Sequence, residues 1–271
     1  MGHILRQIVK TATATVLPAE QKEKIGKFNI NYTKVGHGSH NVVMIPGALG
    51  SVRTHYQHQI NGFNKEKFTL VIFDPQGYGK SIPPERILTK DSYQRDADTA
   101  YELMKHLNIP KYSVMGWSAG GTAGMLLAAQ HPEKIKKIVV WGTNAFLHQD
   151  DLDMYKKIKE ISTWGEHIKQ IMIETYGEEK FSRIWKNWVD TMVDILEVDP
   201  DVCSEQLKNI TCPAYILYGQ KDKMVHPVHF PFLCHHIKNS KYFLYPEGKH
   251  DIHLTYPDDF NQRVQDFLLE E

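Results

Sequence analysis

The chain has 271 residues, of which 41% are hydrophobic, and its 32 basic residues balance 32 acidic ones. This length can bury the core of one domain, or of one domain with an insertion. The balanced charge gives no electrostatic argument for binding nucleic acid or an anionic membrane surface, and no apolar run reaches the length of a transmembrane helix. Three cysteines without metal-like spacing favour a reducing compartment with free thiols: Cys203, Cys212 and Cys234.

The N-terminus carries the pattern of a targeting signal. Residues 1–19 contain no Asp or Glu, and the apolar residues between Ile4 and Val9 fall on one helical face. A basic, amphipathic start of this kind is typical of a mitochondrial presequence, and a short structural helix or frayed tail is an equal alternative. We therefore expect residues 1–24 to be a separate segment and the protein to be mitochondrial, with the cytoplasm as the alternative.

Three strands are expected in the first third of the chain. Residues 28–32 alternate with period two and suit an edge strand of an antiparallel opening. Residues 42–45 and 68–73 are short apolar runs bounded by turn residues, which is typical of buried strands. Residues 91–107 carry apolar side chains at helical spacing and predict a helix.

The middle of the chain holds the motif Gly116–Gly120, which reads G-x-S-x-G between a predicted strand, 111–117, and a predicted helix, 120–130. This is the nucleophile elbow of α/β-hydrolases, a sharp turn that exposes the serine hydroxyl and needs small neighbours. We therefore predict that Ser118 is a nucleophile. The backbone N–H of Ala119 is then placed to bind a developing oxyanion.

A second oxyanion donor is expected in the loop Pro46–Gly50, which follows the strand predicted at 42–45. α/β-Hydrolases place their second backbone N–H in this loop. The donor is Ala48 or Leu49, and the assignment depends on that of Ser118.

The region after the next strand, 138–141, differs from the rest of the chain. Residues 146–208 are rich in Lys, Glu, Trp and Met and predict helices without a strand. We interpret them as a helical cap over the carboxyl end of the sheet, where open α/β sheets bind ligands. The core then comprises residues 25–145 and 209–271.

Asp222 is the predicted acid of a catalytic triad. It lies in a turn just after the strand predicted at 214–218, and α/β-hydrolases order their triads Ser, then Asp or Glu, then His. Asp74 also follows a strand and is the competing acid, but it precedes Ser118 in the chain.

His250 is the predicted base among the chain's fifteen histidines. It follows the last predicted strand, 242–245, and precedes the final helix, about 258–269, whereas His253 is the nearest alternative. In such a triad the neutral histidine takes the serine proton and returns it to the leaving group, while the acid orients and stabilises the imidazole. Alternating strands and helices predict an α/β fold with a mostly parallel sheet covered on both faces.

The chain resembles the α/β-hydrolase superfamily from about residue 25 to its end. Asp74–Ser81 is similar to the superfamily turn D-x-R-G-x-G-x-S, with Gln76 where Arg is usual. More narrowly, the chain resembles the valacyclovir hydrolases, or biphenyl hydrolase-like proteins. The segments that carry this resemblance are Ile45–Ser51, Gly116–Ser118, Val140–Ala145, Trp164, Lys186–Asp190 and Pro246–His250.

The resemblance implies cofactor-free hydrolysis of small esters, notably α-amino acid esters. In that family an Asp directly after the nucleophile pairs with the substrate ammonium group, but this chain has Ala119 there. Either a cap carboxylate replaces it or the preferred acyl group is not cationic; the candidate carboxylates are Asp150, Asp151 and Asp153. We expect Trp117, Trp164 and Asp150 to contact the substrate.

Other activities are open on the same fold. Dehalogenases and epoxide hydrolases need a carboxylate nucleophile, which the elbow lacks. A cofactor-free haloperoxidase, a C–C bond hydrolase and a non-enzymatic ligand receptor are alternatives to the esterase. No metal site is expected, because one further histidine cluster lacks carboxylates at metal spacing; its members are His226, His229, His235 and His236.

Overall fold

Eight strands form one sheet in the computed structural model, which describes residues 19–270. Their order across the sheet is β1-β2-β4-β3-β5-β6-β7-β8. The presequence prediction falls largely outside the described residues. The strands are β1 (Glu20–Ile25), β2 (Phe28–Val35), β3 (His40–Ile45), β4 (Phe68–Phe73), β5 (Tyr112–Trp117), β6 (Ile135–Trp141), β7 (Ala214–Gly219) and β8 (Ser240–Tyr245).

The sheet is antiparallel only where the described chain begins. β1 pairs with β2, and β2 with β4, in antiparallel register, and every later pairing is parallel. The edge position predicted for residues 28–32 is wrong, because β1 covers the outer side of β2. The sheet therefore begins at Glu20, five residues before the expected start of the core at residue 25.

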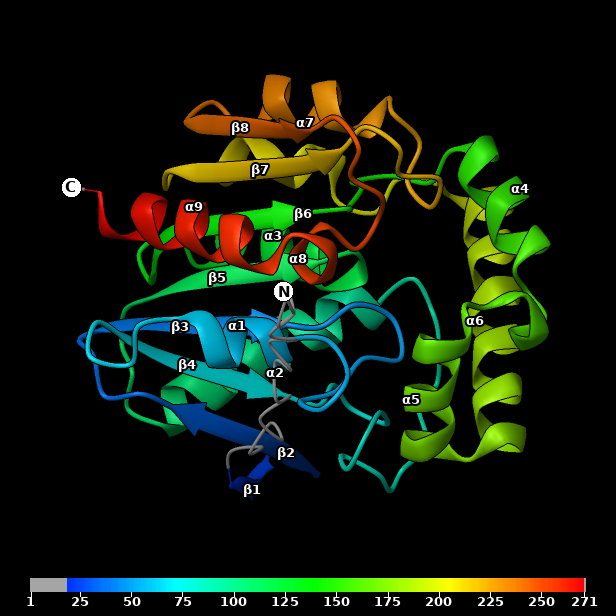
Figure 1. Ribbon diagram of the computed structural model, residues 1–271, viewed down its shortest axis with the longest axis horizontal. Coiled ribbons are helices and arrows are strands. Elements are labelled where there is room, and N and C mark those ends of the chain that lie inside the picture. Colours follow the sequence, from blue (N-terminus) through cyan, green and yellow to red (C-terminus); the bar gives the residue numbers. More distant parts are fainter. Residues whose placement is uncertain (1–18, 271) are drawn as a thin grey trace, which may run out of the picture.

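Helices cover both faces of the sheet, as Figure 1 shows. Side chains of β4 alternate between two apolar clusters, since Val71 and Phe73 join one cluster and Leu70 and Ile72 join the other. This period of two is why a buried strand is apolar throughout. One face carries α2 (Ser92–His106), α3 (Ala119–Gln130) and α7 (His229–His236), and the other carries α1 (Gln57–Gly62), α8 (Ile252–Thr255) and α9 (Pro257–Leu269).

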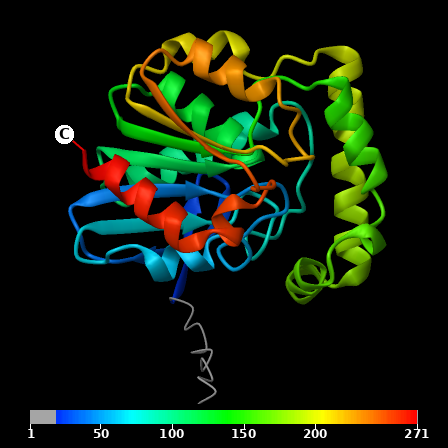
Figure 2. The same cartoon turned by 45° about the horizontal axis from the view of Figure 1, so that its top comes forward.

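A group of helices inserted between β6 and β7 stands across the carboxyl ends of the parallel strands (Figures 1 and 2). The Tyr176 hydroxyl fastens this group to the core: it donates to the Leu49 carbonyl oxygen at 2.7 Å and accepts from the Gly79 N–H at 2.9 Å. We call α4, η1, α5 and α6 the cap; they are α4 (Gln149–Lys157), η1 (Ile161–Thr163), α5 (Glu166–Tyr176) and α6 (Glu178–Val198). A further 3-10 helix, η2 (Ser204–Asn209), packs against α3. Within residues 19–270, no helix combines the length and apolar character that a bilayer crossing requires.

Candidate active site

Ser118 sits on a tight turn between β5 and α3. Its backbone angles are φ 55° and ψ −126°, a region that non-glycine residues occupy only when the surroundings hold them there. The Ser118 N–H donates to the Trp141 carbonyl oxygen at 3.0 Å. A Cβ at Gly120 would lie 2.0 Å from the Ile45 carbonyl oxygen, and one at Gly116 would lie 2.3 Å from the Gly120 carbonyl oxygen. Both glycines of the motif are therefore required by close backbone approach.

His250 and Asp222, which follow β8 and β7, meet at the same edge of the sheet. His250 Nδ1 lies 2.9 Å from Asp222 Oδ2. The other oxygen, Oδ1, accepts from the N–H groups of Met224 at 2.7 Å and Val225 at 3.2 Å. An ionised carboxylate only accepts, so Nδ1 carries the shared proton and Nε2 of neutral His250 is left as an acceptor. The indole N–H of Trp117 donates to the His250 carbonyl oxygen at 2.9 Å and holds this loop in place.

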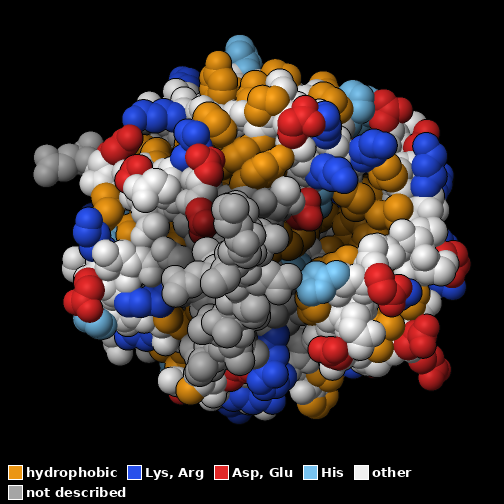
Figure 3. All heavy atoms as spheres, viewed as in Figure 1, with side chains coloured by type: hydrophobic (Ala, Val, Ile, Leu, Met, Phe, Trp, Pro, Cys, Tyr) orange, Lys and Arg blue, Asp and Glu red, His pale blue; other side chains and the backbone are white. Residues whose placement is uncertain are grey.

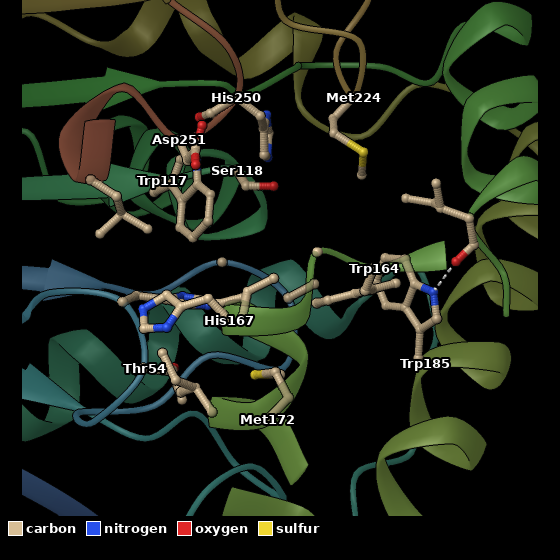
Figure 4. Close-up of a pocket in the computed structure, with 18 of the residues that line it drawn as sticks. Thr54, Trp117, Ser118, Trp164, His167, Met172, Trp185, Met224, His250 and Asp251 are labelled. Atoms are coloured by element: carbon tan, nitrogen blue, oxygen red, sulfur yellow. Dashed lines mark hydrogen bonds between the residues drawn. The ribbon is translucent and has the colours of Figure 1, made fainter. Parts of the chain in front are cut away.

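A cavity of about 790 Å³ opens beside these groups, between the core and the cap. Ser118 and His250 both line it, and Figure 4 shows the serine side chain next to the imidazole. From outside, Figure 3 shows a hollow with apolar side chains in this part of the molecule. A volume of this size suits a small organic molecule.

The two residues predicted as oxyanion donors, Ala48 and Ala119, lie in the same part of the structure as Ser118: Ala48 lines the cavity with it, and Ala119 follows it in the chain. Ala48 lines the cavity and also shares a narrow recess with Ala119. Because Ala119 is the first residue of α3, its N–H has no acceptor within the helix. Leu49, the other candidate, does not line the cavity: its side chain is fully buried and its φ is 59°.

Aromatic side chains form the wall of the cavity opposite Ser118. Trp185 and Trp188 of α6 stack with ring centroids 4.9 Å apart, and Trp164 meets Trp185 edge to face at 4.8 Å. Trp117 and Trp164, which we expected to contact the substrate, both line the cavity. The wall favours an apolar ligand body.

The cap carboxylates considered as amine anchors lie away from this cavity. The substrate-contact prediction for Asp150 is not supported, because the α4 N-terminus turns toward His226, whose Nε2 lies 3.1 Å from the Asp150 carboxylate. Asp151 is fully buried against His229, and Asp153 accepts from a neighbouring side chain.

Two other carboxylates do line the cavity, and sequence reasoning missed both. Glu166 pairs with Lys169 at 2.7 Å. Within the described part of the chain, the Asp251 carboxylate has no ion pair or hydrogen bond, and Figure 4 shows it beside Trp117. The only sequence signal for Asp251 is its position directly after His250.

Asp74 and His253, the alternatives considered for the triad acid and base, are both held by hydrogen bonds in the protein interior. Asp74 is buried and accepts from the N–H groups of Val52 at 2.6 Å and Lys80 at 2.7 Å, and burial raises the pKa of its carboxyl. His253 is fully buried; it accepts from Trp141 at Nδ1 and faces the His55 carbonyl oxygen through Nε2. Neither side chain lines the cavity.

Gln76 leaves the superfamily turn without its usual arginine, yet a buried ion pair lies nearby. Arg86 donates to both carboxylate oxygens of Asp96, at 2.9 and 2.7 Å, and to the Gln76 carbonyl oxygen at 3.0 Å. Of the further histidine cluster, only His226 belongs to a potential metal-binding group among the residues described, and its partners are His148 and Asp150 at the start of α4. The three cysteines, all within the described range, form no disulfide.

Comparisons with known proteins identify the family to which the chain belongs. Residues 40–161 match the family model described as alpha/beta hydrolase fold. The chain is 37% identical to the serine hydrolase BPHL of Mus musculus, over 97% of this chain and 90% of that protein. It is 39% identical to serine hydrolase BPHL of Homo sapiens, over 91% and 85%. The solved enol-lactonase of Burkholderia xenovorans has the same fold, with a TM-score of 0.74 at 17% identity over 92% of this chain and all (100%) of the lactonase.

Proposed function

Because the chain belongs to the α/β-hydrolase family and is a serine hydrolase related to BPHL, we propose that it cleaves small carboxylic esters. The proposed machinery is Ser118 as nucleophile, His250 as base and Asp222 as its partner. The observation that carries the proposal is the strained turn at Ser118 opening into the same cavity as the paired His250.

The reaction proceeds in two halves through an acyl-enzyme. His250 Nε2 takes the Ser118 proton as Oγ attacks the ester carbonyl, and the N–H groups of Ala48 and Ala119 stabilise the oxyanion. His250 then protonates the departing alcohol, and Asp222 stabilises the imidazolium. A water activated by His250 cleaves the acyl-enzyme, releasing the acid and restoring Ser118. No metal or cofactor takes part in this scheme.

The substrate body we propose is apolar, because Trp164, Trp185 and Trp188 form much of the wall. α-Amino acid esters are the class that the family resemblance implies, and Ala119 cannot pair with an ammonium group. Asp251 is the proposed substitute, since a cation entering an apolar cavity needs a counter-charge and this carboxylate is without a protein partner in residues 19–270.

The test compares the wild type with Ser118→Ala on p-nitrophenyl esters and amino acid esters. We expect the folded variant to lose turnover by a factor on the order of 10⁴, because covalent catalysis is removed. A fluorophosphonate probe should label the wild type and not the variant. A wild type that neither labels nor turns over esters would instead indicate a ligand receptor, and full activity in the variant would refute the triad.

A further inference from the structure

Two histidines and an aspartate from distant parts of the chain meet where the cap begins. His148 is the N-cap of α4, Asp150 lies in its first turn, and His226 lies on the loop between β7 and α7. Asp150 Oδ2 is 3.1 Å from His226 Nε2 and 3.6 Å from His148 Nδ1. One ligand atom from each residue falls within 4.8 Å of the other two.

These separations resemble those of a metal-binding site. Ligands placed about 2.0–2.1 Å from a tetrahedral zinc ion stand about 3.3 Å apart, between the two distances measured here. Two imidazole nitrogens and one carboxylate oxygen are ligands that zinc accepts, with water as the fourth. The rings of His148 and His226 are stacked, with centroids 4.4 Å apart. Their side chains are 37% and 34% exposed. His148 Nδ1 accepts from the Asp150 N–H at 3.2 Å and His226 Nδ1 accepts from the Val228 N–H at 3.3 Å, so an ion bound to both rings must replace these two hydrogen bonds.

A buried carboxylate beneath this cluster holds both segments in place. Asp151 accepts from the N–H of His148 at 3.0 Å and from the N–H of His226 at 2.6 Å. It also lies 2.7 Å from His229 Nε2, and both side chains are fully buried. The backbones that carry the ligands are therefore positioned by folding, just as hydrogen-bonded neighbours orient the ligands in metal proteins.

The charges around Asp150 also favour the binding of a cation. In the described part of the chain, Asp150 forms no ion pair with a lysine or arginine, and its ion-pair partners there are the two imidazoles. The positive end of the α4 dipole opposes a cation here, and the carboxylates of Asp150 and Asp151 in the first turn offset it.

We propose that His148, Asp150 and His226 bind a zinc ion that joins the cap to the core. The core loop that carries His226 also carries Asp222, the partner of His250, and Met224, which lines the cavity. The ion is structural: it fixes the first cap helix against this loop and takes no part in ester cleavage.

The test is calorimetric titration of the full, metal-free chain with Zn²⁺, beside titration with Co²⁺ followed by its visible absorption. We expect one tight site per chain, tetrahedral cobalt bands, and a rise in melting temperature with Zn²⁺, since an ion that binds only the folded state stabilises it. His226→Gln and Asp150→Asn should each weaken the site by about tenfold or more.

His235→Gln is the matched control, because His235 is exposed on α7 and lies outside the cluster. It should bind Zn²⁺ as the wild type does. Melting temperatures measured without metal show whether each variant is folded. Wild-type affinity in folded His226→Gln and Asp150→Asn, or the absence of a stoichiometric site in the wild type, would overturn the proposal.

Discussion

Asp251→Asn tests how a substrate amine is recognised. The replacement keeps the size and shape of the side chain and removes its charge. A hydrogen bond between charged groups contributes about 1.5–3 kcal/mol, equivalent to a factor of about 10–150 in specificity. Asp251 is half-buried at the cavity wall, and water screens its charge, so we expect the lower end, about tenfold.

The assay measures kcat/KM for an α-amino acid ester and for the same ester without its amine. The ratio of the two values isolates amine recognition, because the des-amino substrate reports any indirect effect on the neighbouring His250. Glu166→Gln is the matched control, since Glu166 lines the same cavity but already pairs with Lys169. We expect the ratio to fall in Asp251→Asn and to be unchanged in Glu166→Gln.

Two results would refute this reasoning. An unchanged ratio in Asp251→Asn would show that its carboxylate does not meet the substrate amine. A fall in Glu166→Gln alone would assign the role to Glu166. Both results leave the esterase proposal standing, because the des-amino ester tests that proposal separately.

The remaining predictions concern the nucleophile's neighbours and the buried histidines. Ala119→Asp should increase the preference for amino esters over des-amino esters, because it introduces a carboxylate beside Ser118; an unchanged or reduced ratio would contradict this. His250→Ala should be nearly inactive, whereas His253→Gln should lower the melting temperature while retaining turnover, and the reverse ranking would show that the base is misassigned. Burial lowers the pKa of His55 to about 3 and that of His253 well below its ordinary value of 6.5, so only the unfolded chain takes up these protons as the pH falls below 6.5. The free energy of unfolding should therefore fall from pH 6.5 downward by up to about 1.4 kcal/mol per pH unit for each histidine. Urea unfolding at pH 6.5, 5.5 and 4.5 measures this free energy, and a constant value across the three would contradict the prediction.

The amino-acid sequence by itself determined the fold class and the residues proposed for the chemistry. Ser118, Asp222 and His250 each follow a short apolar run, and the carboxyl ends of neighbouring parallel strands meet at one edge of a sheet. The turn at Ser118 is also encoded locally, since Gly116 and Gly120 are the residues that its close backbone contacts allow. Local pattern was sufficient here because backbone geometry and strand direction place these groups.

Other elements lacked a local signal strong enough to predict them. β1 is mostly polar and largely exposed, so no apolar alternation distinguishes it from the N-terminal segment. The short helices α1, α7 and α8 lack a repeated apolar stripe and are stabilised by packing against longer elements.

Only the tertiary structure decided which side chains face the cavity and which meet at the cap. Asp150 and Asp251 are both acids near a helix start, yet Asp251 lines the cavity and Asp150 meets His226, 76 residues away in sequence. The difference arises from how the cap sits on the core, which long-range contacts such as that of Tyr176 with Leu49 determine. Local periodicity specifies that a helix forms and which stripe is apolar, but the direction in which its first turn points depends on packing between distant segments.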